Sequence, residues 1–175
     1  MEIKRVFLVG FMGSGKSTLG RRLKHEMSWN FLDLDDVFEE KFQTTIKQYF
    51  ADYGEDAFRI AEKECLHDVM HLENVIIATG GGTPCFFDNM EVMNKNGLTI
   101  YLKLSVETII SRLSSGKNVR PLVADKSGDE LYNFIDEKLK EREGFYSQSK
   151  VIADAEILSV DAYVNIIRAS SDLSS

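Results

Sequence analysis

Residues 10–18 read GFMGSGKST, and no other stretch of the chain constrains its fold as strongly. Their glycines, together with Lys16 and Ser17, fit the pattern G-x-x-x-x-G-K-[ST] of a phosphate-binding P-loop. The apolar residues 6–9 precede the pattern and a segment compatible with a helix follows it, which is the strand–loop–helix context that the motif requires. A glycine-rich turn that only ends a strand would need neither the lysine nor the serine. The motif therefore predicts a site for a nucleoside triphosphate.

The residue types of this loop suit phosphate chemistry. Glycines let backbone N–H groups turn inward around anionic oxygens, and the following helix directs its positive N-terminal end at them. Lys16 is expected to reach the β- and γ-phosphates, and Ser17 is expected to bind Mg²⁺.

The charge balance limits the partners of the chain. Its 175 residues fit one domain, and a formal net charge of -7 without a basic tract argues against binding to nucleic acid or to an anionic membrane. No signal peptide is apparent and no apolar run approaches the ~20 residues of a membrane span, so we expect a cytoplasmic protein. Cys65 and Cys85 have no neighbouring Cys or His at metal-ligand spacing, which indicates buried or incidental thiols in a reducing compartment.

Apolar runs and amphipathic segments alternate along the chain. Strands are predicted at residues 5–9, 29–32, 75–78, 99–104 and 151–153. Helices are predicted at residues 16–27, 56–72, 87–94, 106–114, 128–148 and 160–169. This alternation predicts an α/β fold in a single domain, residues 1–175, with a parallel sheet and helices on both of its faces.

Two segments interrupt the alternation. Residues 36–72 are long and helical, more than a connection between two strands needs. Residues 114–127 are polar, rich in Gly and Ser, and without a clear period. Such a loop in a compact domain is either functional or disordered, and in a phosphotransferase a flap that excludes water is its natural role.

Two carboxylates follow the second predicted strand, in the sequence FLDLDD. Asp33 and Asp35 stand at i and i+2, which on a strand places both side chains on one face, past the carboxyl edge where α/β sheets bind ligands. Asp33 is a candidate for holding the water shell of Mg²⁺, and Asp35 for accepting a proton from an attacking hydroxyl. The alternative is that Asp35 or Asp36 only caps the following helix.

Two arginines occupy helical positions of different character. Arg59 has Glu55 at i−4 and Glu62 at i+3, so an ordinary surface ion pair would explain it. Arg142 lies in line with the apolar stripe of its helix. It should therefore meet an anion or open into a cleft, unless its side chain reaches solvent from near the helix end.

The sequence TGGGT follows the third predicted strand. Glycines at 80–82 allow very close approach of a ligand to the backbone, whereas a tight turn alone would need one or two. The strand does not end in the acidic residue that many P-loop ATPases use for Mg²⁺, which shifts that role toward Asp33. In the polar loop, Arg120 could deliver a cation to the transferring phosphoryl group, or it could be a solvated loop arginine.

Taken as an ordered series, these motifs resemble the shikimate kinase family. The resemblance extends over about residues 5–168 and rests on GFMGSGKST, FLDLDD, GEDAFR with a following glutamate, GGG, NVRPL and REGFY. It implies a three-layer P-loop kinase fold with strand order 2-3-1-4-5, a helical substrate-binding insertion at residues 36–72 and a lid at residues 114–127. It also implies transfer of the γ-phosphate of ATP to the 3-hydroxyl of shikimate, with Mg²⁺, by a protein that is usually a monomer.

The resemblance assigns roles residue by residue. The ATP phosphates would be held by Gly13, Ser14, Gly15, Lys16, Ser17, Thr18 and, from the lid, Arg120. Mg²⁺ would be bound by Ser17 and supported by Asp33. Shikimate would be bound by Asp35, Arg59, Gly80, Gly81, Gly82 and Arg142. The arginines would grip its carboxylate, and the catalytic residues would be Lys16, Asp35 and Arg120.

Two other functions remain open at this point. A related small-metabolite kinase, such as a gluconate kinase, would also need arginines and a carboxylate for a polyol acid. A non-catalytic nucleotide-binding regulator would be expected to have lost Lys16, Asp35 or one of the arginines, and this chain retains them. One departure from the family lies between Lys150 and Arg168, where no basic residue is present for a contact with adenine.

Overall fold

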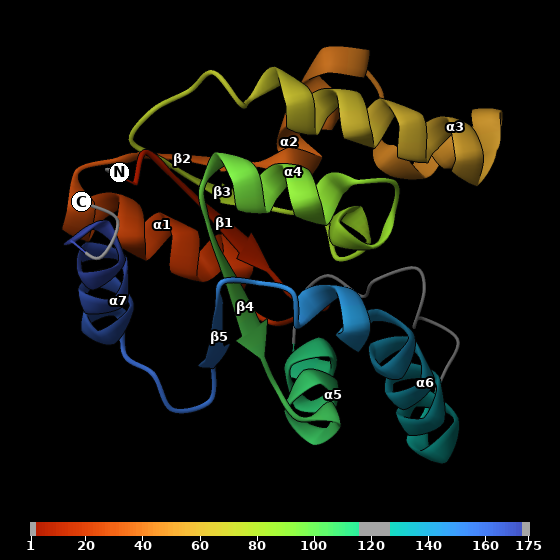
Figure 1. Cartoon of the computed structure of the whole chain (residues 1–175). Helices are drawn as coiled ribbons and strands as arrows, with labels where there is room; N and C mark the ends of the chain where they lie inside the picture. The colour runs from red at the N-terminus through yellow and green to blue at the C-terminus, as the bar shows by residue number, and fades with distance from the viewer. Residues whose placement is uncertain (1–2, 116–126, 173–175) are drawn as a thin grey trace.

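The computed structural model describes residues 3–115 and 127–172 of the chain. Its centre is a sheet of five parallel strands in the order β2-β3-β1-β4-β5 (Figure 1). The strands are β1 (Arg5–Val9), β2 (Asn30–Asp33), β3 (Val75–Ala78), β4 (Leu98–Lys103) and β5 (Val151–Asp154). The predicted α/β class and the strand order implied by the family resemblance are both confirmed.

Helices cover both faces of the sheet. They are α1 (Lys16–Met27), α2 (Leu34–Phe42), α3 (Ile46–Asp68), α4 (Asn89–Asn96), α5 (Val106–Ser115), α6 (Gly128–Tyr146) and α7 (Val160–Asp172), with a short 3₁₀ helix at Thr83–Cys85. Successive strand residues point to opposite faces, so β1 contributes Val6 and Leu8 to the layer with α1 and α7. It contributes Phe7 and Val9 to the layer with α4, α5 and α6. This burial on both faces explains why β1 reads as an unbroken apolar run.

The register of the strands brings three loops to one edge of the sheet. Ala78 of β3 pairs with Leu8 of β1 on one side and with Asp33 of β2 on the other. The P-loop after β1, the acidic residues after β2 and the glycines after β3 therefore leave the sheet next to one another. Ligands of α/β sheets bind at this carboxyl edge, so it is the place to look for a site.

The insertion expected at residues 36–72 forms two helices, α2 and α3, which lie side by side at one end of the molecule (Figure 1). They pack through an aromatic cluster in which the rings of Phe38 and Phe58 lie 5.0 Å apart. Gly54 interrupts α3 with φ at 80° and ψ at 177°, so the helix predicted at 56–72 matches only its second half. That prediction also ran past the end of α3 at Asp68.

The predictions for β1, α1 and β3 are confirmed at both ends, and the other predicted boundaries differ by a few residues. β2 begins at Asn30 and ends at Asp33, one residue later at each end, and α4 begins at Asn89 rather than at residue 87. Most of the predicted lid, 114–127, lies outside the described residues, and Arg120 lies there too. Within the described part of the chain, no helix is both long enough and apolar enough to cross a membrane.

Candidate active site

The P-loop joins β1 to α1 and forms part of the wall of a cavity of about 630 Å³. Gly15 caps α1 with φ at 92°, a left-handed conformation that favours glycine. The Lys16 ammonium donates hydrogen bonds to the carbonyl oxygens of Gly10 at 2.7 Å and Phe11 at 2.9 Å. The loop thus holds this cation at the start of α1, where free N–H groups and the positive helix end attract anions.

Ser17 and Asp33 meet between α1 and β2. The Ser17 hydroxyl donates a 2.5 Å hydrogen bond to Asp33 Oδ2, and Asp33 Oδ1 accepts the backbone N–H of Asp35 at 3.1 Å. Asp33 ends β2 and caps α2, so the alternative that Asp35 or Asp36 is the cap is wrong. Asp35 lies in the first turn of α2, so the expectation that it shares a strand face with Asp33 is wrong as well. Asp33, Asp35 and Lys16 nevertheless line the same cavity.

The Ser17–Asp33 pair suits a hard divalent cation. Its contacting atoms are hydroxyl and carboxylate oxygens, and Mg²⁺ prefers such donors, keeps several waters and needs few protein ligands. Both residues line the cavity beside the P-loop, where phosphate oxygens would complete the shell. Among the described residues, no group of three or more His, Cys, Asp or Glu could hold an ion alone. The site therefore fits a metal held jointly with a phosphate-bearing ligand.

The turn after β3 lies close to two carboxylates. A Cβ atom added to Gly80 would lie 2.9 Å from Glu62 Oε1 and 3.3 Å from Asp35 Oδ1. These distances are shorter than an ordinary van der Waals contact, so a side chain here would displace one carboxylate or both. Glycine at this position therefore lets carboxylates from α3 and α2 approach the same peptide.

The next two glycines lie against the two arginines that the sequence singled out. A Cβ atom added to Gly82 would lie 2.7 Å from Arg59 Nη1, and one added to Gly81 would lie 3.5 Å from Arg142 Nη1. Arg59 belongs to α3 and Arg142 to α6, so two helices bring their guanidinium groups to adjacent peptides. Close approaches of charged side chains thus explain the glycines at 80 and 82, whereas a Cβ atom on Gly81 would make only ordinary van der Waals contacts.

Arg59 is nearly buried, although the sequence also allowed a surface ion pair. Its side chain is 12% exposed, and it donates to Glu62 Oε2 at 2.8 Å and to Glu55 Oε1 at 3.3 Å. The guanidinium also lies over the ring of Phe86, 4.1 Å from the ring centre. A surface ion pair explains the contact of Arg59 with the exposed Glu55, but it does not explain the contacts of Arg59 with Glu62 and Phe86.

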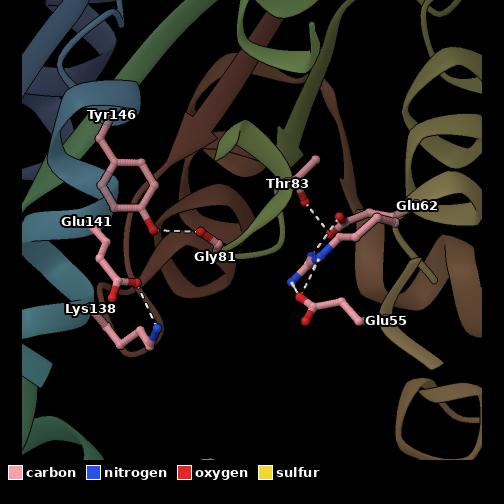
Figure 2. Close-up of polar contacts among 8 residues, drawn as sticks. Glu55, Glu62, Gly81, Thr83, Lys138, Glu141 and Tyr146 are labelled. Carbon is pink, nitrogen blue, oxygen red and sulfur yellow. Dashed lines mark hydrogen bonds and ion pairs between the residues drawn. The ribbon is translucent and has the colours of Figure 1, made fainter. Parts of the chain in front are cut away.

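Glu62 connects Arg59 to the glycine turn. Its other oxygen, Oε1, accepts the hydroxyl of Thr83 (Figure 2), at a distance of 2.6 Å. The Glu62 side chain is 7% exposed. A buried carboxylate needs partners that offset its desolvation, and an arginine and a hydroxyl supply them here. Sequence reasoning identified Glu62 only as a helical neighbour of Arg59 and missed Thr83 and Phe86, because their contacts arise from folding around the turn.

Arg142 lies beside the P-loop. Its guanidinium carbon is 5.4 Å from the centre of the Phe11 ring, and Nη1 faces Gly81. Phe11 also accepts a hydrogen bond from Lys16 through its carbonyl, so Arg142 stands next to the segment that carries the phosphate-binding lysine. The side chain therefore points inward and does not reach out to solvent from the helix end.

The far end of the cavity contains a basic residue that sequence reasoning missed. Arg112, in α5, donates to the Ser14 carbonyl at 3.0 Å and to the Ala155 carbonyl at 3.4 Å. Ala155 and Leu158 follow β5 and line the cavity with Arg112. The sequence around the last strand offers no basic residue, whereas the fold brings Arg112 to this place from 43 residues before Ala155.

The cavity therefore has two ends with different chemistry. Its volume of about 630 Å³ is within the range of small-molecule sites. The lining includes Arg112, the P-loop and Gly81. Arg59 and Arg142 do not themselves line the cavity; they lie beside Gly82 and Gly81, behind its glycine side. A triphosphate in the P-loop could thus meet a second, anionic ligand at the turn.

Burial shifts the pKa of two groups near the turn. Desolvation raises the pKa of the Cys85 thiol to about 11, although the charges of Arg142 and Arg59 act in the opposite direction. Desolvation also raises the pKa of Tyr146 above its ordinary value. Both groups stay neutral at neutral pH, so neither competes with an anion for the arginines. Cys65 is buried and Cys85 half-buried, and both are free thiols, in line with the expectation from sequence.

Comparison with known proteins gives a consistent result. The family model described as shikimate kinase matches residues 12–169. A shikimate kinase of Parabacteroides distasonis is 47% identical over 165 residues, which cover 94% of this chain and 95% of that protein. The crystal structure of shikimate kinase from Bacteroides thetaiotaomicron has a TM-score of 0.88, with 39% identity and 98% coverage of both chains. Shikimate kinase from Acinetobacter baumannii in complex with shikimate has a TM-score of 0.80, with 28% identity, 98% coverage of this chain and 92% of that chain.

Proposed function

The chain belongs to the shikimate kinase family and transfers the γ-phosphate of ATP to the 3-hydroxyl of shikimate, and we propose how its residues divide this work. The products are ADP and shikimate 3-phosphate, and the reaction serves aromatic amino-acid biosynthesis. Membership of this family decides against the gluconate kinase and the non-catalytic regulator. The observation that carries our assignment of residues is the turn at 80–82, where carboxylates and guanidinium groups approach three successive peptides beside the P-loop cavity.

ATP lies along the cavity with its triphosphate in the P-loop. Backbone N–H groups of residues 13–18 surround the phosphate oxygens. Lys16 exchanges the carbonyl oxygens of Gly10 and Phe11 for oxygens of the β- and γ-phosphates. This exchange is favourable because hydrogen bonds from a cation to an anion are stronger than those to a neutral carbonyl. The end of the cavity near Arg112 is left for the adenine ring.

The residues that would hold Mg²⁺ are Ser17, through its hydroxyl, and Asp33, directly or through bound waters. When bound, Mg²⁺ neutralises charge on the β- and γ-phosphates and orients them for transfer. Asp33 has a second task, because it orients the Ser17 hydroxyl and caps the helix that carries Asp35.

Shikimate lies at the glycine turn with its carboxylate between Arg59 and Arg142. A guanidinium group binds a carboxylate through paired N–H donors, which fixes orientation as well as adding energy. Arg59 is already held by Glu62 and Phe86, so it loses little side-chain entropy when the substrate binds. The ring hydroxyls then face Asp35 and the backbone of the turn.

Asp35 accepts the proton of the 3-hydroxyl as the hydroxyl oxygen attacks the γ-phosphorus. The bond from phosphorus to the bridging oxygen breaks, and Lys16 stabilises the negative charge that develops as ADP leaves. Positioning is a large part of this catalysis, since orientation of two reactants can contribute about 7–11 kcal/mol. Arg120 would add a cation from the lid at residues 114–127, and closure of the lid would keep water from the γ-phosphate.

We further propose a cytoplasmic monomer of one domain, with ATP and shikimate as its partners and with neither a nucleic acid nor a membrane. The net charge of -7 opposes binding to polyanions. Light scattering coupled to size-exclusion chromatography tests the monomer directly.

Asp35→Asn tests the assignment of the base, with Asp36→Asn as the matched control one position along the same helix turn. A coupled assay measures ADP release with shikimate as the sole acceptor, and calorimetry measures binding of ATP–Mg²⁺. We expect Asp35→Asn to lower kcat by about 10²–10⁴-fold while ATP binding stays within twofold. Asp36, which is exposed, should be replaceable without loss. An unchanged kcat in Asp35→Asn would remove Asp35 from this role.

A further inference from the structure

Tyr146 reaches the glycine turn from the end of α6. Its hydroxyl donates a hydrogen bond to the carbonyl oxygen of Gly81 (Figure 2), at a distance of 2.5 Å. The residue is 0% exposed. Tyr146 stands one helical turn after Arg142, so both residues meet Gly81 from the same stretch of α6. Tyr146 takes no part in the phosphate binding assigned to the P-loop or in the proton transfer assigned to Asp35.

A second set of contacts fastens the same end of α6 to the sheet. The Tyr146 ring packs on the ring of Tyr101 in β4, with 5.1 Å between ring centres. The Tyr101 hydroxyl donates to Glu143 Oε2 at 2.7 Å, and Lys103 donates to Glu143 Oε1 at 2.7 Å. The helix end is therefore attached at two points, through Glu143 to β4 and through Tyr146 to the glycine turn.

The glycine turn needs such an attachment. A run of glycines has more conformational freedom than any other sequence, so its peptides keep one orientation only when neighbours hold them. The carbonyls of Gly80 and Gly82 accept backbone N–H groups from within the turn and the short helix that follows it. The carbonyl of Gly81 instead accepts a side chain from a distant helix, 65 residues along the chain. The Gly81 peptide is thus oriented by Tyr146.

We propose that Tyr146 is a positioning residue for shikimate, which holds the Gly81 peptide and the Arg142 side chain at a fixed distance from each other. This inference rests on the proposed function, in which Gly81 and Arg142 both contact the substrate. Tyr146 touches neither ATP nor shikimate. It acts by fixing the two groups that do, one through its hydrogen bond and the other through the backbone of α6.

The hydroxyl is suited to a constant structural bond. Burial raises the pKa of Tyr146 above its ordinary value, and the smaller opposing effect of the Arg142 charge does not cancel it. The hydroxyl therefore keeps its proton over the working pH range and remains a donor. A buried hydroxyl that lost its acceptor would be left with its full desolvation cost, which favours the paired geometry.

Tyr146→Phe tests the proposal, since it removes the hydroxyl and keeps the ring packed on Tyr101. The matched control is Tyr101→Phe, which also removes one buried hydroxyl but leaves Glu143 bound to Lys103. For Tyr146→Phe we expect a rise of about fivefold in the KM for shikimate, the size expected for one lost neutral hydrogen bond, with the KM for ATP within twofold. For Tyr101→Phe we expect both KM values within twofold. Melting temperatures of both variants report the purely structural cost.

Arg142→Ala completes the design. If it raises the KM for shikimate while Tyr146→Phe does not, the positioning role is wrong and the assigned binding roles stand. If Tyr101→Phe raises that KM as much as Tyr146→Phe does, the effect is general loosening and the proposal is also wrong. If Arg142→Ala itself leaves the KM for shikimate unchanged, the assigned substrate contacts fail, and the positioning role fails with them.

Discussion

Arg59 and Arg142 belong to different helices, yet their guanidinium groups lie beside neighbouring glycines of one turn. A Cβ atom added to Gly82 would lie 2.7 Å from Arg59 Nη1, and one added to Gly81 would lie 3.5 Å from Arg142 Nη1. Two like charges are held near one turn, which is costly unless an anion joins them. Glu62 offsets part of the charge on the Arg59 side. The carboxylate of shikimate is the ligand group that would complete this arrangement.

Gly82→Ala is expected to displace Arg59. The added methyl would meet Nη1 at 2.7 Å and Nη2 at 2.8 Å, so the guanidinium must move away from the turn. We expect the KM for shikimate to rise about tenfold or more, with little change in the KM for ATP. The control is Gly144→Ala in α6, where an added Cβ meets nothing within 4 Å. That change should leave kinetics intact and raise the melting temperature, because alanine favours a helix over glycine.

Lys16→Met is expected to abolish most turnover. Methionine keeps an unbranched side chain in the loop but loses the positive charge that Lys16 directs toward the transferring phosphate. Removal of a group that stabilises developing charge costs about 10²–10³ in kcat. Single-turnover assays at saturating shikimate measure the loss, and melting curves show whether the variant is folded. A folded variant with nearly normal turnover would contradict the assigned role of Lys16.

Asp33→Asn separates the metal role of Asp33 from its structural role. Asparagine caps helices as well as aspartate does, so α2 and the melting temperature should change little. The loss of negative charge should raise the free Mg²⁺ needed for half-maximal activity about tenfold or more, measured by titration of Mg²⁺ at fixed ATP. A lower melting temperature with an unaltered Mg²⁺ requirement would mean that Asp33 serves the fold alone.

Glu156→Gln should weaken the dependence of the protein's stability on pH in the acid range. Glu156 accepts the Ser105 hydroxyl at 2.6 Å and the Ser105 N–H at 3.0 Å, and these hydrogen bonds lower its pKa to about 2. The unfolded chain has a glutamate pKa of about 4.3. A lowered pKa stabilises the folded state above the unfolded pKa, and this stabilisation is lost as pH falls from about 4.3 toward about 2.

The measurement is the melting temperature of both proteins from pH 7 to pH 2.5. The melting temperature of wild type should exceed that of Glu156→Gln by a constant difference near neutral pH. This difference in melting temperature should shrink below about pH 4.3. A difference in melting temperature that stays constant throughout the acid range would show that the carboxylate charge of Glu156 contributes nothing to the stability of the fold.

Local patterns were sufficient for the parallel sheet and for the phosphate-binding loop, whereas the order of the strands followed only from the family resemblance. A P-loop fixes its own strand, turn and helix, and the apolar alternation fixes the parallel sheet. The position of Arg142 in an apolar helix stripe also pointed to a constrained environment, and the structure places that side chain beside Phe11 and Gly81. These inferences needed no knowledge of distant contacts.

The contacts around the glycine turn were not predictable in the same way. Asp35 was placed on a strand because periodicity cannot tell the last residue of a strand from the first turn of a helix, and Asp33 decides that boundary by capping α2. Phe86 and Thr83 carry no motif of their own. Arg112 reaches the cavity from α5, and nothing within its helix distinguishes it from a surface arginine. Such partners are selected by topology, not by spacing along the chain.

The central claim is that the two arginines recognise the carboxylate of shikimate. The most direct measurement compares kcat/KM for shikimate with that for its methyl ester, in wild type and in Arg142→Ala. Wild type should prefer the acid by about 10²-fold or more, because the ester carries no anion for the two guanidinium groups, and the preference should fall at least about tenfold in the variant. An equal preference in both proteins would contradict the account.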